Sequence, residues 1–233
     1  MLTLAFETSA KAASVAILDG KKLLGESYQN TGLTHSQTLM VMAEDLIRTC
    51  GYTPQQIEAV AVAAGPGSFT GVRIGVAAAK GFAWGRELPC CGVSTLEAMA
   101  LNLGVHSGYI VPVMDARRSQ VYTATFHAQG GELSRICEDR AISLEALGEE
   151  LKNLQEQIFL VGDGSILCYN TLKATVPQLI LPPEHKMHQR GVGVALAAMA
   201  QMARGEQGDG ESLAPNYLRL SQAERERLTR ENR

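Results

Sequence analysis

The sequence has no surplus of positive charge. Its 233 residues include 21 Lys and Arg residues against 24 Asp and Glu residues, which gives a net charge of −3 at pH 7 and a pI near 6.0. Domains that bind nucleic acid on their own usually carry a basic surplus. We therefore do not expect an autonomous nucleic-acid-binding protein, although this composition leaves room for local basic patches.

The sequence also lacks a long hydrophobic run and a leader-like start. Its longest unbroken apolar stretch, near residues 191–200, is far shorter than the roughly 18 residues that a membrane span requires. The first residues, MLTLAFE, reach an acidic residue at once and contain no basic residue, unlike a signal peptide. We expect a cytoplasmic protein that does not contact a membrane.

Paired cysteines are missing as well. The five cysteines form no C-x-x-C pair, and an odd number without a disulfide framework is typical of a reducing compartment. The remaining composition, 45% hydrophobic and 19% charged, is that of an ordinary globular protein. A chain of this length can bury a sizeable core in one or two domains.

The most informative stretch that is present is GPGSFTGVRIG at residues 65–75. It follows an apolar run that predicts a buried strand, and Ser68 or Thr70 can cap a helix after it. Such a joint can hold a phosphate on free backbone N–H groups, but Pro66 removes one donor. The helix is rich in small residues, and each internal Gly costs about 1 kcal/mol relative to Ala. We expect another protein to press closely on this helix.

The order of predicted elements repeats along the chain. A strand at residues 2–6 ends in Glu7 and is followed by a hairpin with an Asp-Gly turn, a helix near 35–50 and a strand at 57–64. A strand at 109–114 ends in Asp115, and a hairpin, a helix and a strand follow it in the same order. Two such units predict an α/β, duplicated actin-like (ASKHA, ribonuclease H-like) fold, with two lobes of mixed sheets flanked by helices.

We place the boundary between the lobes near residue 105. Residues 1–105 would form the first lobe with the partner-binding helices. Residues 106–233 would form a smaller, degenerate second lobe plus a C-terminal tail that packs back on the first lobe.

The first predicted helix is apolar on nearly every side. Leu39, Met42, Ala43 and Leu46 form one stripe, and Met40 widens it. A helix of this kind is either deeply buried or shared with a partner, and methionines suit adaptable interfaces. Together with the small-residue helix at 70–84 it predicts half of an intermolecular helical bundle. The predicted contact residues are Leu39, Met42, Ala43, Leu46, Gly71, Val72, Arg73, Gly75 and Val76.

Three turns have residues that suit a nucleotide, and each has an ordinary structural interpretation beside it. The acid-ended ETS turn at 7–9 can face phosphates or simply end a capped strand, and no glycine follows it. The GDGS turn at 162–165 can present backbone N–H groups or form a tight strand-to-helix turn, and the Asp-Ala-Arg-Arg turn at 115–118 can clamp a phosphate or lie exposed. The candidate nucleotide contacts are Glu7, Thr8, Ser9, Asp115, Arg118, Gly162 and Gly164.

We expect no metal site in this chain. His185 and His188 are three residues apart, but a proline pair precedes them and no third ligand is evident, so an exposed loop is the favoured interpretation.

Four motifs together resemble the TsaB (YeaZ) family across essentially the whole chain. They are ETS at 7–9, GPGSFTGVR at 65–73, DARR at 115–118 and PNYLR at 215–219. The GPGSFTG stretch is shared with the paralogous TsaD family, so the other motifs decide between the two. The catalytic paralogue has a His-x-x-x-His metal pair where this sequence has Thr95 and Met99, and a metal-binding Asp where it has Arg190 or Gly191. A site without its ligands cannot hold the metal.

The resemblance implies a non-catalytic scaffold or activator needed to make threonylcarbamoyladenosine at the tRNA adenosine next to the anticodon. It implies binding to a TsaD-type transferase through a helical bundle and to a TsaE-type ATPase, and pairing with itself when alone. It implies contact with tRNA only through the complex and no firmly bound cofactor, with ATP or ADP at most at the complex interface. The alternative from the residues is an autonomous actin-like ATPase or small-molecule kinase, although such kinases are usually longer.

Overall fold

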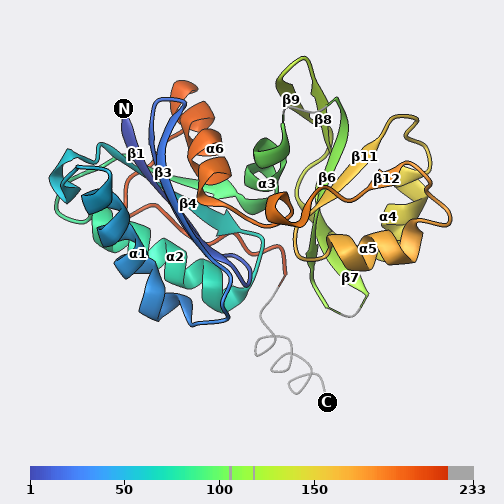
Figure 1. The fold of residues 1–233 in the computed structure, drawn as a ribbon, viewed down its shortest axis with the longest axis horizontal. Helices are drawn as coiled ribbons and strands as arrows, with labels where there is room; N and C mark the ends of the chain where they lie inside the picture. The colour runs from blue at the N-terminus through green and yellow to red at the C-terminus, as the bar shows by residue number, and fades with distance from the viewer. Residues whose placement is uncertain (105–106, 118, 220–233) are drawn as a thin grey trace.

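The computed structural model covers the full chain and describes residues 1–104, 107–117 and 119–219. It consists of two mixed β-sheets with helices on both faces of each (Figure 1). No helix in the described residues is long and apolar enough to cross a membrane.

The first sheet contains five strands in a mixed arrangement. β1 is antiparallel to β2 and parallel to β4, β2 is antiparallel to β3, and β4 is parallel to β5. β1 and β4 are buried along their whole length, as expected for strands with both faces covered. In spatial order the strands are β3 (Lys22–Gln29), β2 (Ala13–Asp19), β1 (Leu2–Glu7), β4 (Ala59–Gly65) and β5 (Cys90–Ser94).

The second sheet repeats this order and these directions. β6 is antiparallel to β7 and parallel to β11, β7 is antiparallel to β10, and β11 is parallel to β12. A hairpin of β8 and β9 adds to β6. The main path is β10 (Arg140–Ser143), β7 (Gln120–Thr123), β6 (Gly108–Asp115), β11 (Ile158–Val161) and β12 (Leu179–Ile180), with β8 (Phe126–Gln129) and β9 (Glu132–Arg135) off it. The matching topologies confirm the predicted duplicated actin-like fold.

Two helices cover the outer face of each sheet. α1 (His35–Thr49) and α2 (Phe69–Ala83) pack on the first sheet. α4 (Leu144–Leu151) and α5 (Ser165–Leu172) pack on the second. Two short 3₁₀ helices, Pro54–Gln56 and Glu184–Lys186, lie in connecting segments.

The two halves exchange their last helices. α3 (Thr95–Leu103) follows the first sheet but packs on the inner face of the second. α6 (Gly191–Ala203) follows the second sheet but packs on the inner face of the first. Figure 1 shows the two helices between the sheets, and a Cβ at Gly193 would lie only 2.0 Å from the carbonyl oxygen of Ala98. The division of the chain near residue 105 stays a prediction.

The hairpin expected after Asp115 has an interrupted second strand. Residues 120–129 form two short strands, β7 and β8, which pair with opposite ends of β6. Pro112 lies in β6 between the two paired regions and has no N–H to donate to the ladder. The proline therefore accounts for the interruption, which the alternation of apolar residues in the partner strand does not reveal.

Candidate functional site

Gly71 of the GPGSFTG motif and Gly75 pack against Thr8, the residue that follows β1. The Thr8 hydroxyl donates to the carbonyl oxygen of Gly71 at 2.7 Å. A Cβ at Gly71 would lie 2.1 Å from the Thr8 carbonyl oxygen, and one at Gly75 would lie 2.5 Å from the Thr8 Oγ1. The chain itself therefore occupies the space beside these two glycines. This corrects the expectation that another protein presses on this part of α2.

The space beside the turn before α2 is also occupied by the chain itself, at Ser9. The Ser68 N–H donates to the Ser9 carbonyl oxygen at 2.7 Å, and a Cβ at Gly67 would lie 2.5 Å from the same oxygen. The Gly71 N–H donates to the Ser68 Oγ at 3.3 Å, so Ser68 rather than Thr70 caps the helix. Two backbone donors of this turn, at Ser68 and Gly71, therefore already have partners within the chain.

Glu7 is a buried acid at the end of β1. One of its carboxylate oxygens accepts from the Ser9 N–H at 2.6 Å, and the other has no hydrogen-bond partner in the described structure. Burial raises the pKa of Glu7 to about 7, and the negative charge of Asp163 adds to the rise. Near neutral pH this carboxyl group is therefore divided between its protonated and ionised forms.

The candidate residues of the second lobe lie at the ends of β6 and β11. Desolvation raises the pKa of Asp163, and the charge of Asp115 contributes. The Gly162 N–H donates to the Met187 carbonyl oxygen at 2.6 Å, and the Gly164 N–H donates to the Val113 carbonyl oxygen at 3.0 Å. These two glycines form a tight turn against β6 and offer no free donor. Arg118, the remaining candidate, lies outside the described residues.

Some of the backbone donors that a phosphate would use in these turns are occupied within the chain. Their backbone donors at Ser9, Ser68, Gly71, Gly162 and Gly164 all bond within the chain. The acidic groups beside them would repel a polyphosphate. Across residues 1–104, 107–117 and 119–219, no cluster of three or more His, Cys, Asp or Glu residues is placed to hold a metal ion.

The predicted partner contacts on α1 and α2 lie mostly on the buried faces of these helices. Of the nine, only Arg73 is exposed. The buried members are Leu39, Met42, Ala43, Leu46, Gly71, Val72, Gly75 and Val76. In the isolated chain these eight residues face the first sheet or Thr8 rather than solvent, so their contact with a partner stays a prediction. Helical periodicity marks a face but does not tell which face is the outer one.

The outer faces of the two helices carry a different set of residues. Met40 and Val41 on α1 are 45% and 57% exposed, and Trp84, just after α2, is 81% exposed. Gly81 has open space where its Cβ would be. A hollow of about 440 Å³ lies between the helices and is lined by Met40, Pro54, Gln55, Ala78, Gly81, Phe82 and Arg86. We call the exposed residues Met40, Val41, Thr70, Arg73, Ala77, Gly81 and Trp84 the outer helical face.

The C-terminal segment joins this face to the second lobe. The Asn216 N–H donates to the Ala64 carbonyl oxygen at 2.7 Å at the end of β4. The Tyr217 ring stacks on Phe69, with centroids 4.3 Å apart, and its hydroxyl oxygen accepts from the Nε of Arg73 at 2.6 Å. The sequence of the PNYLR motif did not predict that Tyr217 would contact Phe69 and Arg73.

Arg219 connects the C-terminal segment to the second lobe. Its guanidinium donates to the carbonyl oxygen of Ala116 at 2.9 Å. Three of the four motifs of the resemblance therefore meet in one place, and the fourth, ETS, lies against the GPGSFTG helix.

The positions that the resemblance leads us to compare with metal ligands of the paralogue make other contacts in this structure. Thr95 is fully buried, and Met99 packs beside Gly162. Arg190 donates through Nε to Glu26 at 3.1 Å. A Cβ at Gly191 would lie 2.9 Å from the Ala16 nitrogen, so a larger side chain has no space there.

Comparisons with known proteins find relatives along most of the chain. The family model described as TsaD, tRNA N6-adenosine threonylcarbamoyltransferase, matches residues 29–227. The tRNA threonylcarbamoyladenosine biosynthesis protein TsaB of Bacillus subtilis strain 168 is 32% identical over 225 residues, 96% of each chain. The chain belongs to the TsaB (YeaZ) family. The TsaB protein of Escherichia coli K12 is 35% identical over 168 residues, 70% of this chain and 72% of that protein.

A solved structure shows the same fold. YeaZ from Pseudomonas aeruginosa superposes with a TM-score of 0.72 at 25% identity, covering 93% of this chain and 99% of that one. The resemblance that the four motifs carry is thereby confirmed at the level of the family and of the fold.

Proposed function

We propose that this protein is a non-catalytic scaffold subunit for threonylcarbamoylation of the tRNA adenosine next to the anticodon. In this proposal it binds a TsaD-type transferase through the outer helical face, contributes to recruiting a TsaE-type ATPase, and pairs with itself when alone. It meets tRNA through the complex, and any ATP or ADP lies at the complex interface.

The outer helical face is the observation that carries the proposal. Its α2 residues are spaced three or four apart, so they lie on one side of the helix. Small side chains such as Ala77 and Gly81 let a second helix approach closely, and nothing in the described chain fills the space above Gly81. Exposed apolar residues from two neighbouring helices suit a helical bundle shared with a partner.

The contacts at the aligned ligand positions support the non-catalytic part of the proposal. Thr95 and Met99 are buried between the lobes, and neither side chain is a usual metal ligand. Arg190 is committed to an ion pair with Glu26, and a positive charge at this position opposes metal binding.

The alternative, an autonomous actin-like ATPase or kinase, draws on the acidic groups Glu7, Asp115 and Asp163 near the ends of the strands. Its weakness is that the backbone donors at Ser9, Ser68, Gly71, Gly162 and Gly164 already bond within the chain. Steady ATP turnover by the purified chain that disappears in Asp115→Asn would favour this alternative. No turnover above a protein-free blank would count against it.

A binding titration with the TsaD-type subunit of the same organism tests the scaffold proposal. Ala77→Glu places a charge in the middle of the outer helical face, and Glu is a good helix former, so the fold should persist. We expect association to weaken by about a hundredfold, as for an unpaired charge in an interface. Ile166→Asp is the control, because Ile166 is also apolar and 54% exposed but lies on α5. Equal affinities for the two variants would contradict the proposal.

A further inference from the structure

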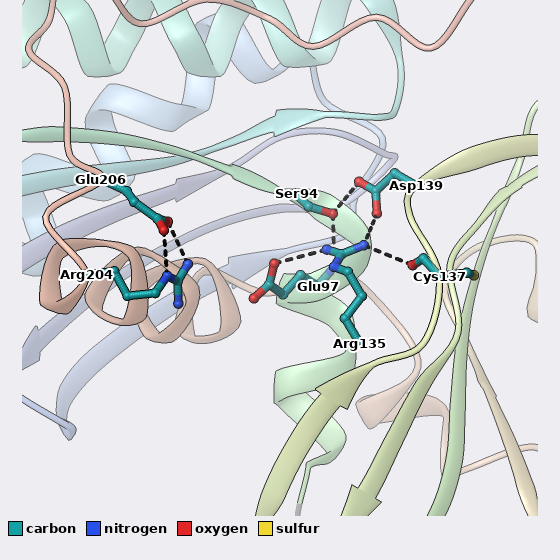
Figure 2. Close-up of polar contacts among 7 residues, drawn as sticks. All are labelled: Ser94, Glu97, Arg135, Cys137, Asp139, Arg204 and Glu206. Atoms are coloured by element: carbon teal, nitrogen blue, oxygen red, sulfur yellow. Dashed lines mark hydrogen bonds and ion pairs between the residues drawn. The ribbon is translucent and has the colours of Figure 1, made fainter.

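Four polar side chains beside α3 join the two lobes: Ser94, Glu97, Arg135 and Asp139 (Figure 2). We call them the Arg135 cluster. Arg135, the last residue of β9 in the second lobe, donates to Glu97 on α3 at 3.0 Å and to Asp139 at 2.7 Å. Asp139 also accepts from the hydroxyl of Ser94, the last residue of β5 in the first sheet, at 2.5 Å. The cluster therefore connects the edge of one sheet to a hairpin of the other.

This cluster differs from an ordinary surface ion pair. The side chains of Arg135 and Asp139 are only 24% and 9% exposed, so solvent and salt screen them less than surface charges. The guanidinium bonds two carboxylates through different nitrogens and lies over the Phe126 ring at 4.7 Å. Bonds between ionised groups are roughly twice as strong as neutral ones when their geometry is fixed.

Ser94 ties the cluster to the backbone of α3. Its Oγ accepts from the Glu97 N–H at 3.1 Å and thereby caps the helix, while its hydroxyl proton goes to Asp139. Because α3 packs on the second sheet and follows the first, its first turn lies where movement between lobes would have to occur. Loss of the cluster would loosen this turn and the loop that carries Asp139.

A second link between the lobes runs through the C-terminal segment. Asn216 bonds to Ala64 of β4, and Arg219 bonds to Ala116 after β6. Ser94 pairs with Gly65, the neighbour of Ala64, so both links start from the carboxyl ends of adjacent parallel strands. These two links add to the packing of α3 against α6 between the sheets.

We propose that the Arg135 cluster is a clamp that holds the two lobes in one relative orientation. Two-lobed folds commonly open and close about a hinge when they bind a ligand. Here residues of the chain itself bridge the lobes, so the gap between them stays in a single state without any ligand. The proposal does not depend on the function proposed above, because it concerns the isolated chain.

Hydrogen exchange on the full-length protein, followed by mass spectrometry, tests the clamp. In Arg135→Gln we expect at least tenfold faster exchange at the amides of Glu97 and Ile136, which bond to Ser94 and Thr125. Tenfold corresponds to about 1.4 kcal/mol. Exchange in the central strands β1 and β6 should not change, because each lobe keeps its core.

Two further variants make the result decisive. Glu97→Gln keeps the shape of its side chain and removes one charge, so it should show the same pattern even if Arg135→Gln fails to fold. Arg140→Gln is the control, because it removes an ion pair with Glu150 inside the second lobe. Unchanged exchange at the Glu97 amide in both Arg135→Gln and Glu97→Gln would overturn the proposal. Equal acceleration in Arg140→Gln, or in the strands β1 and β6, would also overturn it.

Discussion

The buried carboxyl group of Glu7 makes the stability of this protein depend on pH. Its folded pKa of about 7 lies above the ordinary value of 4.5. Between these values the folded state holds a proton that the unfolded state releases, so stability falls as pH rises through this window. The full difference corresponds to about 3 kcal/mol, of which roughly 2 kcal/mol should be lost between about pH 5.5 and about pH 8.

Urea unfolding at these two pH values measures the effect. Glu7→Gln cannot ionise and still offers an oxygen to the Ser9 N–H, so the variant should lose much less stability than the wild type over this range. Glu132→Gln serves as the control, because Glu132 is exposed on β9. If Glu7→Gln and the wild type lose equal stability with rising pH, Glu7 does not carry the proton that we assign to it.

The glycines of α2 and the C-terminal segment give two further predictions. Gly71→Ala should destabilise the protein by at least about 2 kcal/mol because its Cβ would meet the Thr8 carbonyl oxygen, whereas Gly81→Ala should stabilise it by about 1 kcal/mol because the site is open. Equal effects in thermal melts would refute this distinction. Tyr217→Phe removes the hydroxyl that accepts from Arg73 and should cost about 1 kcal/mol, while Tyr217→Ala also loses the stack on Phe69 and should cost more in the same melts. Equal losses would mean that the stack contributes nothing.

The order of the elements could be predicted from the sequence because each has a local cause. The Asp-Gly turn before Lys21 predicted the first hairpin, and β2 and β3 confirm it. Ser68 or Thr70 was predicted to cap the small-residue helix, and Ser68 caps α2. The acid-ended strands predicted the duplication, and the matching sheet orders confirm it.

The exchange of α3 and α6 between the lobes was not predicted. Both helices are apolar, and their periodicity gives no information about which sheet they cover. The contact of Gly193 with the Ala98 backbone joins residues almost a hundred positions apart. Such a contact depends on the tertiary arrangement rather than on a local pattern.

The candidate site was predicted only in part. The importance of residues 65–75 was evident from the sequence. Why positions 71 and 75 are glycine was not evident, because Thr8, which contacts both, comes from a distant strand. Tyr217 was noted only within a motif, since nothing in the sequence indicates that it stacks on Phe69.

The modified nucleoside in tRNA gives the most direct test of the scaffold proposal. Cells that depend on this chain would carry the wild type, Ala77→Glu or Ile166→Asp, and their tRNA would be digested and analysed for threonylcarbamoyladenosine. We predict that Ala77→Glu, folded and present at the wild-type level, leaves the nucleoside as low as in cells depleted of the protein, while Ile166→Asp leaves it unchanged. A normal amount of threonylcarbamoyladenosine with Ala77→Glu would contradict the proposal that the outer helical face makes this protein a scaffold.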